Sequence, residues 1–278
     1  MRLKFWIKYE LPKYNVIIFF SLLFLISLIV IYSLDKADSN IYKHDILIES
    51  HGLIFDLLVF GIMITIFDFL RSRKERRSRY NEEIEDLVGW EHEEAKIKII
   101  ANVKRLYDLG QRRFFLSNTY LKCADLSDFD LTNSVIAFAN LKKGSFVRSN
   151  LKNVQLTASK LREVYFTKAN LENTDLSNTD CRGAFFTASI IVNTNFKQAD
   201  LREACFIACY YKNVNMEDAK LDKVIVDDLK WFENLQNNGA LNVENLIDKY
   251  FVNPNSRKVK DGLSTYLIEK IKTNKHQL

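Results

Sequence analysis

The sequence predicts a membrane-anchored β-solenoid with helical caps at both ends of its repeats. Three observations support this fold class. An apolar residue recurs at every fifth position through 116–226, similar side chains recur every 20 residues, and an uncharged apolar run fills 14–34. A period of five scatters around a helix and changes face along a strand. It can therefore line one core only if the chain turns at regular intervals, as a solenoid does.

The recurrence every 20 residues sets the size of one coil. Phe146, Phe166, Phe186 and Phe206 follow one another at this spacing, and a parallel series consists mainly of leucine. Like side chains stack on like when each coil contains four five-residue units. With a spacing of about 4.8 Å between strands, the repeats form a rod roughly 28 Å long.

Short motifs of the form Ala-Asp-Leu or Ala-Asn-Leu occur within the repeats, at 124–126, 139–141, 169–171 and 199–201. These motifs resemble the pentapeptide-repeat family, whose consensus is written A(D/N)LXX, and the resemblance covers 116–226. It implies a right-handed quadrilateral β-helix with four pentapeptides per coil. It also implies that the central residue and the small residue two before it point inward, while the other three point outward.

Two segments before the repeats are candidate membrane spans. The run 14–34 has the length and apolarity needed to cross a bilayer core. The second candidate, 50–70, contains Asp56 and Asp68, so a buried helix of a soluble domain stays open as its alternative. Together the two segments predict an N-terminal transmembrane hairpin.

Basic residues around these segments predict the orientation of the hairpin. The segment 1–13 is basic, the loop 35–49 is richer in acids, and a basic cluster follows the second span. That cluster consists of Arg71, Arg73, Lys74, Arg76, Arg77 and Arg79. The positive-inside rule therefore places both termini in the cytoplasm of a bacterium, with a multi-pass hairpin in its inner membrane. The basic cluster would face anionic lipid; a nucleic-acid patch is the alternative.

Asp56 is a candidate polar site within the second span. A carboxylate in a span is costly and usually faces protein, water or a partner. Asp56 either lies near the outer interface or lines a polar interior in an oligomer, and the sequence leaves both possibilities open.

The remaining segments are predicted to cap and complete the rod. Residues 71–110 would form a basic juxtamembrane segment and an amphipathic capping helix, because Ile99, Val103 and Leu106 recur at helical spacing. The pentapeptide-repeat β-helix would occupy 111–228. Apolar spacing in 229–278 predicts a helical cap, since solenoids need their open ends covered.

No catalytic or metal-binding arrangement is recognisable, so the chain is predicted not to be an enzyme and to need no cofactor. Glycine-rich phosphate loops and zinc-protease motifs do not occur. The four cysteines lie within the repeats without ligand spacing, which is typical of small core residues in a reducing compartment.

The family resemblance includes strongly acidic rods that mimic DNA and bind type II topoisomerases. This chain departs from them, because its repeats carry slightly more basic than acidic side chains. Mimicry of DNA needs an acidic surface, so the sequence argues against a topoisomerase partner.

Several outward positions that the motif usually gives to polar residues are apolar here, and stacking should join them into one patch. They are Tyr165, Phe185, Ile190, Cys205, Ile207, Tyr210 and Ile225. Exposed apolar patches usually mark an interface. The patch predicts contact with a cytosolic protein or with a second copy, unless the C-terminal helices fold over it.

These observations predict a non-enzymatic, membrane-anchored scaffold that presents its rod for protein contact or self-assembly. The alternative is a membrane-disrupting or pore-forming effector of the bacterial defence or toxin type. In that alternative the rod would act as a sensor or oligomerisation module, and the hairpins would assemble around Asp56.

Overall fold

The structure is a computed structural model that describes residues 41–260 and 262–271, together with positions 22, 25, 26, 29, 32 and 33. The chain divides into two compact units, Met1–Ser78 and Arg79–Leu278. The predicted cytoplasmic segment 1–13 lies outside the described residues, and so does most of the first predicted span, 14–34.

The helix α3 (Ile41–Glu85) is the longest described element, and the boundary between the two units falls within it. It begins inside 35–49, so the prediction of a loop there is wrong from Ile41 onward. Neither Gly nor Pro interrupts 41–49, which lets the helix run through it. Along the described residues, no helix combines the length and apolarity needed to cross a bilayer, so the predicted span 50–70 is not confirmed.

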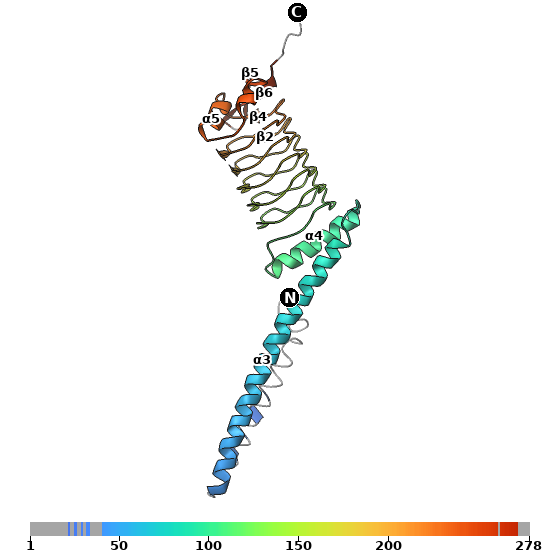
Figure 1. Ribbon diagram of the computed structural model, residues 1–278, viewed down its shortest axis with the longest axis vertical. Coiled ribbons are helices and arrows are strands. Elements are labelled where there is room, and N and C mark those ends of the chain that lie inside the picture. Colours follow the sequence, from blue (N-terminus) through green and yellow to red (C-terminus); the bar gives the residue numbers. More distant parts are fainter. Residues whose placement is uncertain are drawn as a thin grey trace, which may run out of the picture. The chain divides into compact units, whose positions relative to one another are not determined.

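The repeats form the predicted solenoid with 20 residues per coil. Bridging residues pair in parallel with the residue 20 positions later, as in Ser145 with Tyr165 and Tyr165 with Phe185. Figure 1 shows the coils stacked like the rungs of a ladder. One residue in every five, from Asn118 to Lys223, has a positive φ angle between 51° and 65°, and these residues form the corners.

The core of the solenoid is filled by inward residues of the five-residue series. Phe146, Phe166, Phe186 and Phe206 are fully buried, with successive ring centroids 5.4, 5.1 and 4.6 Å apart and nearly parallel planes. This confirms the 20-residue coil that the sequence predicts. Small inward residues make room for the ladder. A Cβ atom on Gly144 would lie 2.9 Å from the Leu141 backbone oxygen, so a larger residue there would require the local backbone to shift.

The N-terminal end of the solenoid is closed by the helix α4 (Glu93–Asp108), as predicted. Ile99, Val103 and Leu106 are buried on one side of this helix. The end of α3 packs beside it, and the buried Asn102 donates a hydrogen bond of 2.9 Å to the Glu83 carboxylate. A polar side chain buried here is tolerated because it is paired.

The C-terminal cap is not purely helical, which corrects the prediction for 229–278. Two short helices, α5 (Trp231–Asn237) and α6 (Glu244–Ile247), lead into an antiparallel hairpin of β5 (Tyr250–Lys260) and β6 (Leu263–Lys270). The leucine spacing at 263 and 267 suggested a helix. The Asp-Gly dipeptide at 261–262 is the hairpin signal that this reading overlooked.

The hairpin joins the last coil by edge pairing. The coils contribute β1 (Ile190–Val192), which pairs with β3 (Tyr210–Lys212), and β2 (Cys205–Phe206), which pairs with β4 (Ile225–Val226). Strand β6 then pairs with β4. The open edge of the last coil is thereby covered, while β5 becomes the outer strand and is broken by a bulge next to Pro254.

Candidate functional site

One side of the solenoid carries an uninterrupted set of uncharged outward residues, and we call it the aromatic face. It lies over the buried phenylalanine ladder. Its outward positions from coil to coil are Ser145, Val147, Tyr165, Thr167, Phe185, Thr187, Cys205 and Ile207. None carries a charge, although 27% of the whole chain is Asp, Glu, Lys or Arg.

Two exposed aromatic rings occupy the middle of this face. The rings of Tyr165 and Phe185 stack with centroids 4.9 Å apart and planes only 5° from parallel. Their exposed fractions are 45% and 37%. The stack is held in place by backbone bonds of the coils beneath, since the Tyr165 N–H donates to the Gly144 carbonyl at 3.0 Å. The face therefore presents a rigid apolar surface to its surroundings.

The structure divides the predicted apolar patch rather than presenting all of it. Cys205 is only 7% exposed, and Ile207 and Ile225 are half-buried. Ile225 lies on β4, where it pairs with Leu267 of the hairpin. The C-terminal segment thus extends the sheet at its upper edge and leaves Tyr165 and Phe185 exposed. The alternative that this segment covers the patch is wrong for these two rings.

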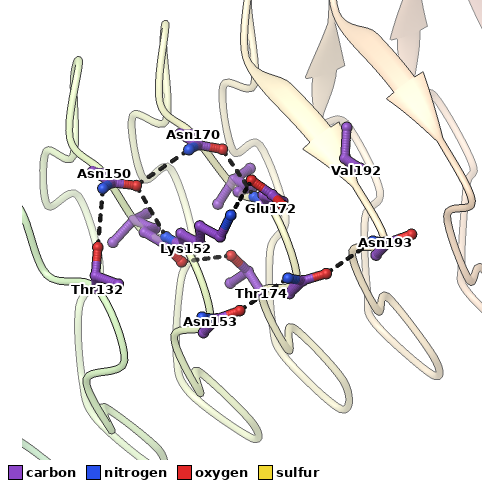
Figure 2. Close-up of polar contacts among 12 residues, drawn as sticks. Thr132, Asn150, Lys152, Asn153, Asn170, Glu172, Thr174, Val192 and Asn193 are labelled. Atoms are coloured by element: carbon purple, nitrogen blue, oxygen red, sulfur yellow. Dashed lines mark hydrogen bonds and ion pairs between the residues drawn. The ribbon is translucent and has the colours of Figure 1, made fainter.

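The other predicted residues, Ile190 and Tyr210, lie on the next face, with exposed fractions of 45% and 59%. Figure 2 shows that this face is polar in the preceding coils. Asn170 donates to Asn150 at 3.2 Å, and Lys152 pairs with Glu172 at 2.8 Å. Ile190 and Val192 follow these residues in the next coil. The outward side chains at these stacked positions therefore change from polar to apolar between one coil and the next.

The corner next to this polar network carries an asparagine ladder. Asn133, Asn153, Asn173, Asn193 and Asn213 are stacked, and each amide donates to the preceding one at 2.9–3.1 Å. Asparagine is one of the few residues that adopt a positive φ readily. The ladder is therefore a structural device that satisfies its own polar groups.

On the other side of the aromatic face lies a face dense in charge, which we call the charged face. Sequence reasoning did not single it out, although its basic column recurs every 20 residues. This column consists of Lys122, Lys142, Arg162, Arg182 and Arg202. Arg182 and Arg202 each bind the aspartate two residues earlier through two hydrogen bonds of 2.6–2.8 Å.

These ion pairs shift the pKa values of the groups involved. The hydrogen bond from Arg182 lowers the pKa of Asp180, and the pKa of Arg182 is raised in turn. Burial raises the pKa of Asp200, but hydrogen bonds from Arg202 outweigh burial and the net shift is downward. These ion pairs keep both partners charged. They do not move the pKa of either group toward neutral pH, as a catalytic acid or base would require.

A shallow groove of about 420 Å³ lies along the edge of the charged face. Gly183 leaves a gap there between Glu163 and Glu203, which occupy the same column one coil below and above. A Cβ atom at Gly183 would have only the Glu163 side chain within 4 Å, so the gap is not a packing requirement.

The cysteines do not form a reactive centre. Burial raises the pKa of Cys181 to about 12 and that of Cys209 to about 11, so both thiols stay protonated near neutral pH. Within the part of the chain that the structure describes, no cluster of three His, Cys, Asp or Glu side chains could hold a metal ion.

The predicted membrane-related residues lie on α3, apart from the solenoid. Asp56 is exposed, as are the apolar side chains of Phe55, Phe60 and Phe67 on the same helix. Arg71 is also exposed and pairs with Glu75 at 2.8 Å. The structure brings the basic cluster together along one helix.

Comparison with known families decides the nature of the repeats. The family model for pentapeptide repeats matches in overlapping stretches at 149–187, 169–207 and 179–218, with 8 copies. The repeat segment is a pentapeptide-repeat solenoid. A comparison with curated proteins finds no match.

Solved structures of pentapeptide repeat proteins are similar to the solenoid. Rfr23 from the cyanobacterium Cyanothece 51142 is 21% identical, with 39% of this chain and 60% of that protein covered and a TM-score of 0.23. A trypsin-treated form of QnrB1, a plasmid-mediated fluoroquinolone resistance protein, is 19% identical over 46% and 70%, with a TM-score of 0.25. A protein of the Arabidopsis thaliana thylakoid lumen is 12% identical over 47% and 79%, with a TM-score of 0.21.

Proposed function

We propose that this protein is a non-enzymatic scaffold whose solenoid binds protein partners through the aromatic face. One observation carries the proposal, namely the exposed Tyr165–Phe185 stack on a face whose outward residues from Ser145 to Ile207 carry no charge. Exposed apolar area of this kind rarely persists on a monomer unless it is used. Burying about 400 Å² of apolar surface, counted over both partners, would contribute roughly 10 kcal/mol before the entropy of association is subtracted.

The experiment that tests this proposal compares crosslinked complexes formed in cells by the parent and by Phe185→Glu. The substituted side chain points outward, so the fold should persist while a charge is placed in the contact. We expect the complexes to disappear and the thermal midpoint to stay within a few degrees of the parent. The matched control is Lys152→Glu on the polar face. Complexes that survive Phe185→Glu would remove the aromatic face as the contact.

We also propose that the N-terminal region attaches the scaffold to the bacterial inner membrane, with both termini in the cytoplasm. The support is the apolar run 14–34, the exposed apolar side chains of α3 and the basic residues that follow them. In this arrangement the basic cluster 71–79 faces anionic lipid. The proposed membrane attachment does not depend on the proposed contact of the solenoid, so an experiment can disprove one without disproving the other.

Fractionation of cells and a topology assay test the attachment. The full chain should stay in the membrane fraction after high-salt and carbonate washes. A reporter fused after Leu278 should be active only in the cytoplasm, and a cysteine placed at Asn40 should react with a membrane-impermeant reagent from outside. Recovery in the soluble fraction would contradict the attachment, and an externally active fusion would contradict the orientation.

The pore-forming alternative makes a different prediction for Asp56. Induced expression would depolarise cells in a way that depends on this carboxylate, whereas a scaffold leaves the membrane potential unchanged. Comparing the parent with Asp56→Asn in a depolarisation assay separates the two functions.

A further inference from the structure

A pocket of about 450 Å³ lies where the last coils of the solenoid meet the helix α5. Three aromatic residues and two aspartates form most of its wall. They are Tyr210, Tyr211, Trp231, Asp227 and Asp228. None of them belongs to the aromatic face, and only Tyr210 was part of the apolar patch that the sequence predicts. The pocket is therefore a feature that the proposed function does not use.

The two aspartates give the pocket a negative charge that the described chain does not balance. Both side chains are half-buried, and no Lys or Arg lines the pocket within the described residues. Lys230 follows them in the sequence, but it pairs with Glu233 at 3.7 Å. Neighbouring carboxylates repel each other, and a cation bound between them would replace this repulsion by attraction.

Neutral donors fix the direction of both carboxylates. The Ala208 N–H donates a hydrogen bond of 2.6 Å to Oδ2 of Asp227. The Lys230 N–H and the Asn234 amide donate to Oδ1 and Oδ2 of Asp228 at 2.9 and 2.6 Å. A carboxylate oxygen can accept more than one hydrogen bond, so these donors orient the two groups without saturating them. The pocket is thus preorganised for a cation.

The aromatic residues of the pocket differ in exposure. Trp231 is only 2% exposed, and its Nε1 donates a hydrogen bond of 3.2 Å to the Tyr211 hydroxyl. These two rings lie edge to face with centroids 6.1 Å apart, which makes a rigid floor. Tyr210, by contrast, is 59% exposed, and no described aromatic ring stacks on it. Its ring is therefore available to a group that enters the pocket.

An apolar side chain adjoins the pocket on the solenoid surface. Ile190 is 45% exposed and lies in register with Tyr210 on the neighbouring strand. In the two preceding coils the same outward position is occupied by Asn150 and Asn170, which are bonded to each other. The exposed Ile190 and Tyr210 would suit the apolar stem of a ligand, and the two carboxylates would suit a cationic end.

We infer that this pocket binds the guanidinium group of an arginine side chain on a protein partner. The flat guanidinium can stack on the Tyr210 ring, and its fork of N–H donors can bond Asp227 and Asp228 together. The methylene groups of the arginine stem would then lie along Ile190. The inference goes beyond the proposed contact of the aromatic face, and neither contact requires the other.

Other cations match fewer of these features. The ammonium group of a lysine is a compact point charge and lacks the flat surface that stacks on Tyr210. A metal ion would use the carboxylates but would gain nothing from the aromatic wall or from Ile190, which offer it no oxygen ligand on that side. Only a guanidinium uses the ring, the apolar side chain and both carboxylates.

Saturation-transfer NMR on the full chain in mild detergent tests the inference, with a capped Leu-Arg-Leu peptide as the probe. The same peptide with citrulline in place of arginine has nearly the same shape without the charge, and it should bind about tenfold more weakly. A lysine peptide should bind about threefold more weakly, since it lacks the ring stack. No binding of the arginine peptide, or equal binding of either comparison peptide, would overturn the inference.

Substitutions show whether the arginine peptide binds in the pocket. Asp227→Asn keeps an acceptor for the Ala208 N–H but removes the charge, and it should weaken binding about fivefold. Tyr210→Ser should weaken binding about threefold, whereas Tyr210→Phe keeps the ring and should bind like the parent. The matched control is Asp125→Asn, an exposed carboxylate bonded to the Ser127 N–H at 3.0 Å in another coil. Unaltered binding by Asp227→Asn, or an equal loss in the control, would overturn the inference.

These measurements are separate from the test of the proposed function. If Phe185→Glu abolishes complexes in cells while the arginine peptide does not bind, the pocket inference alone is wrong. If the peptide binds in the pocket while Phe185→Glu leaves the complexes intact, the aromatic face alone is excluded as a contact.

Discussion

The aromatic face and the charged face are adjacent sides of the same coils, yet their outward residues differ in kind. Beneath them, both rest on fully buried side chains of the same five-residue series. On the charged face, Arg182 and Arg202 form ion pairs with Asp180 and Asp200 within the chain. On the aromatic face, the exposed rings of Tyr165 and Phe185 stack on each other. Folding of the solenoid depends on the inward and corner residues. The outward residues are less constrained by folding, so their chemical character can reflect what each face contacts.

The difference also shows which stabilising terms each face uses. Half-exposed ion pairs contribute little, because solvent screens them and ordering two long side chains costs entropy. The stacked aromatic rings bury apolar surface against each other, and no charged group has to be dehydrated for this contact to form. The side chains of the charged face therefore pair within the chain, whereas the exposed rings of the aromatic face stay available for contact with a partner. Three mutational experiments and one labelling experiment examine this comparison.

The largest effect on the free energy of unfolding is expected from a substitution in the core beneath both faces. Phe186→Ala removes a buried ring between Phe166 and Phe206 and should lower the free energy of unfolding by about 3–5 kcal/mol. Chemical denaturation of the parent and the variant measures the loss. A variant that unfolds at the denaturant concentration of the parent would show that the ladder is not the core.

The next effect is expected from the outward aromatic stack. A double-mutant cycle with Tyr165→Ala and Phe185→Ala should give a coupling free energy of about 0.5–1.5 kcal/mol, because the rings lie parallel at contact distance. Monomeric protein at low concentration is required, so that unfolding alone is measured. A coupling near zero would mean that the two rings contact a partner but not each other.

A smaller effect is expected on the charged face, and it should depend on pH. The folded-state pKa of Asp180 is lowered by Arg182, so this pair stabilises the fold above the unfolded pKa of about 3.9 and loses that contribution as pH falls through the folded pKa. Arg182→Ala should lower the thermal midpoint only slightly at pH 7, since solvent screens a pair whose side chains are partly exposed. Thermal melts of parent and variant should converge near pH 2, and a difference that persists there would exclude the ion pair as its cause.

The smallest effect concerns the cysteines beneath the two faces. Cys123 is exposed at a corner, whereas Cys181 is buried with a pKa raised to about 12. A thiol reagent at pH 8 should modify Cys123 within minutes and Cys181 only on unfolding. Mass spectrometry after partial labelling identifies the modified residue, and rapid modification of Cys181 would show that the coils open.

The candidate interface illustrates the limit of sequence reasoning. Tyr165, Phe185, Ile190 and Tyr210 are exposed as predicted, because the motif alone decides that these positions point outward. Cys205 and Ile225 occupy equivalent positions, but Cys205 is buried, and Ile225 is half-buried where its strand pairs with the hairpin. The basic column of the charged face is visible in the sequence at a spacing of 20 residues, but only the structure shows that Arg182 and Arg202 pair with aspartates of the same face.

The sequence by itself determined the coil length and the inward residues of the solenoid. These depend on local spacing, which repeats every five and every 20 residues and leaves little choice of register. The C-terminal cap was decided only by tertiary structure. Its apolar spacing fits a helix as well as a strand, and pairing of β6 with the open edge at β4 selects the strand because it satisfies backbone groups that a helix would leave exposed.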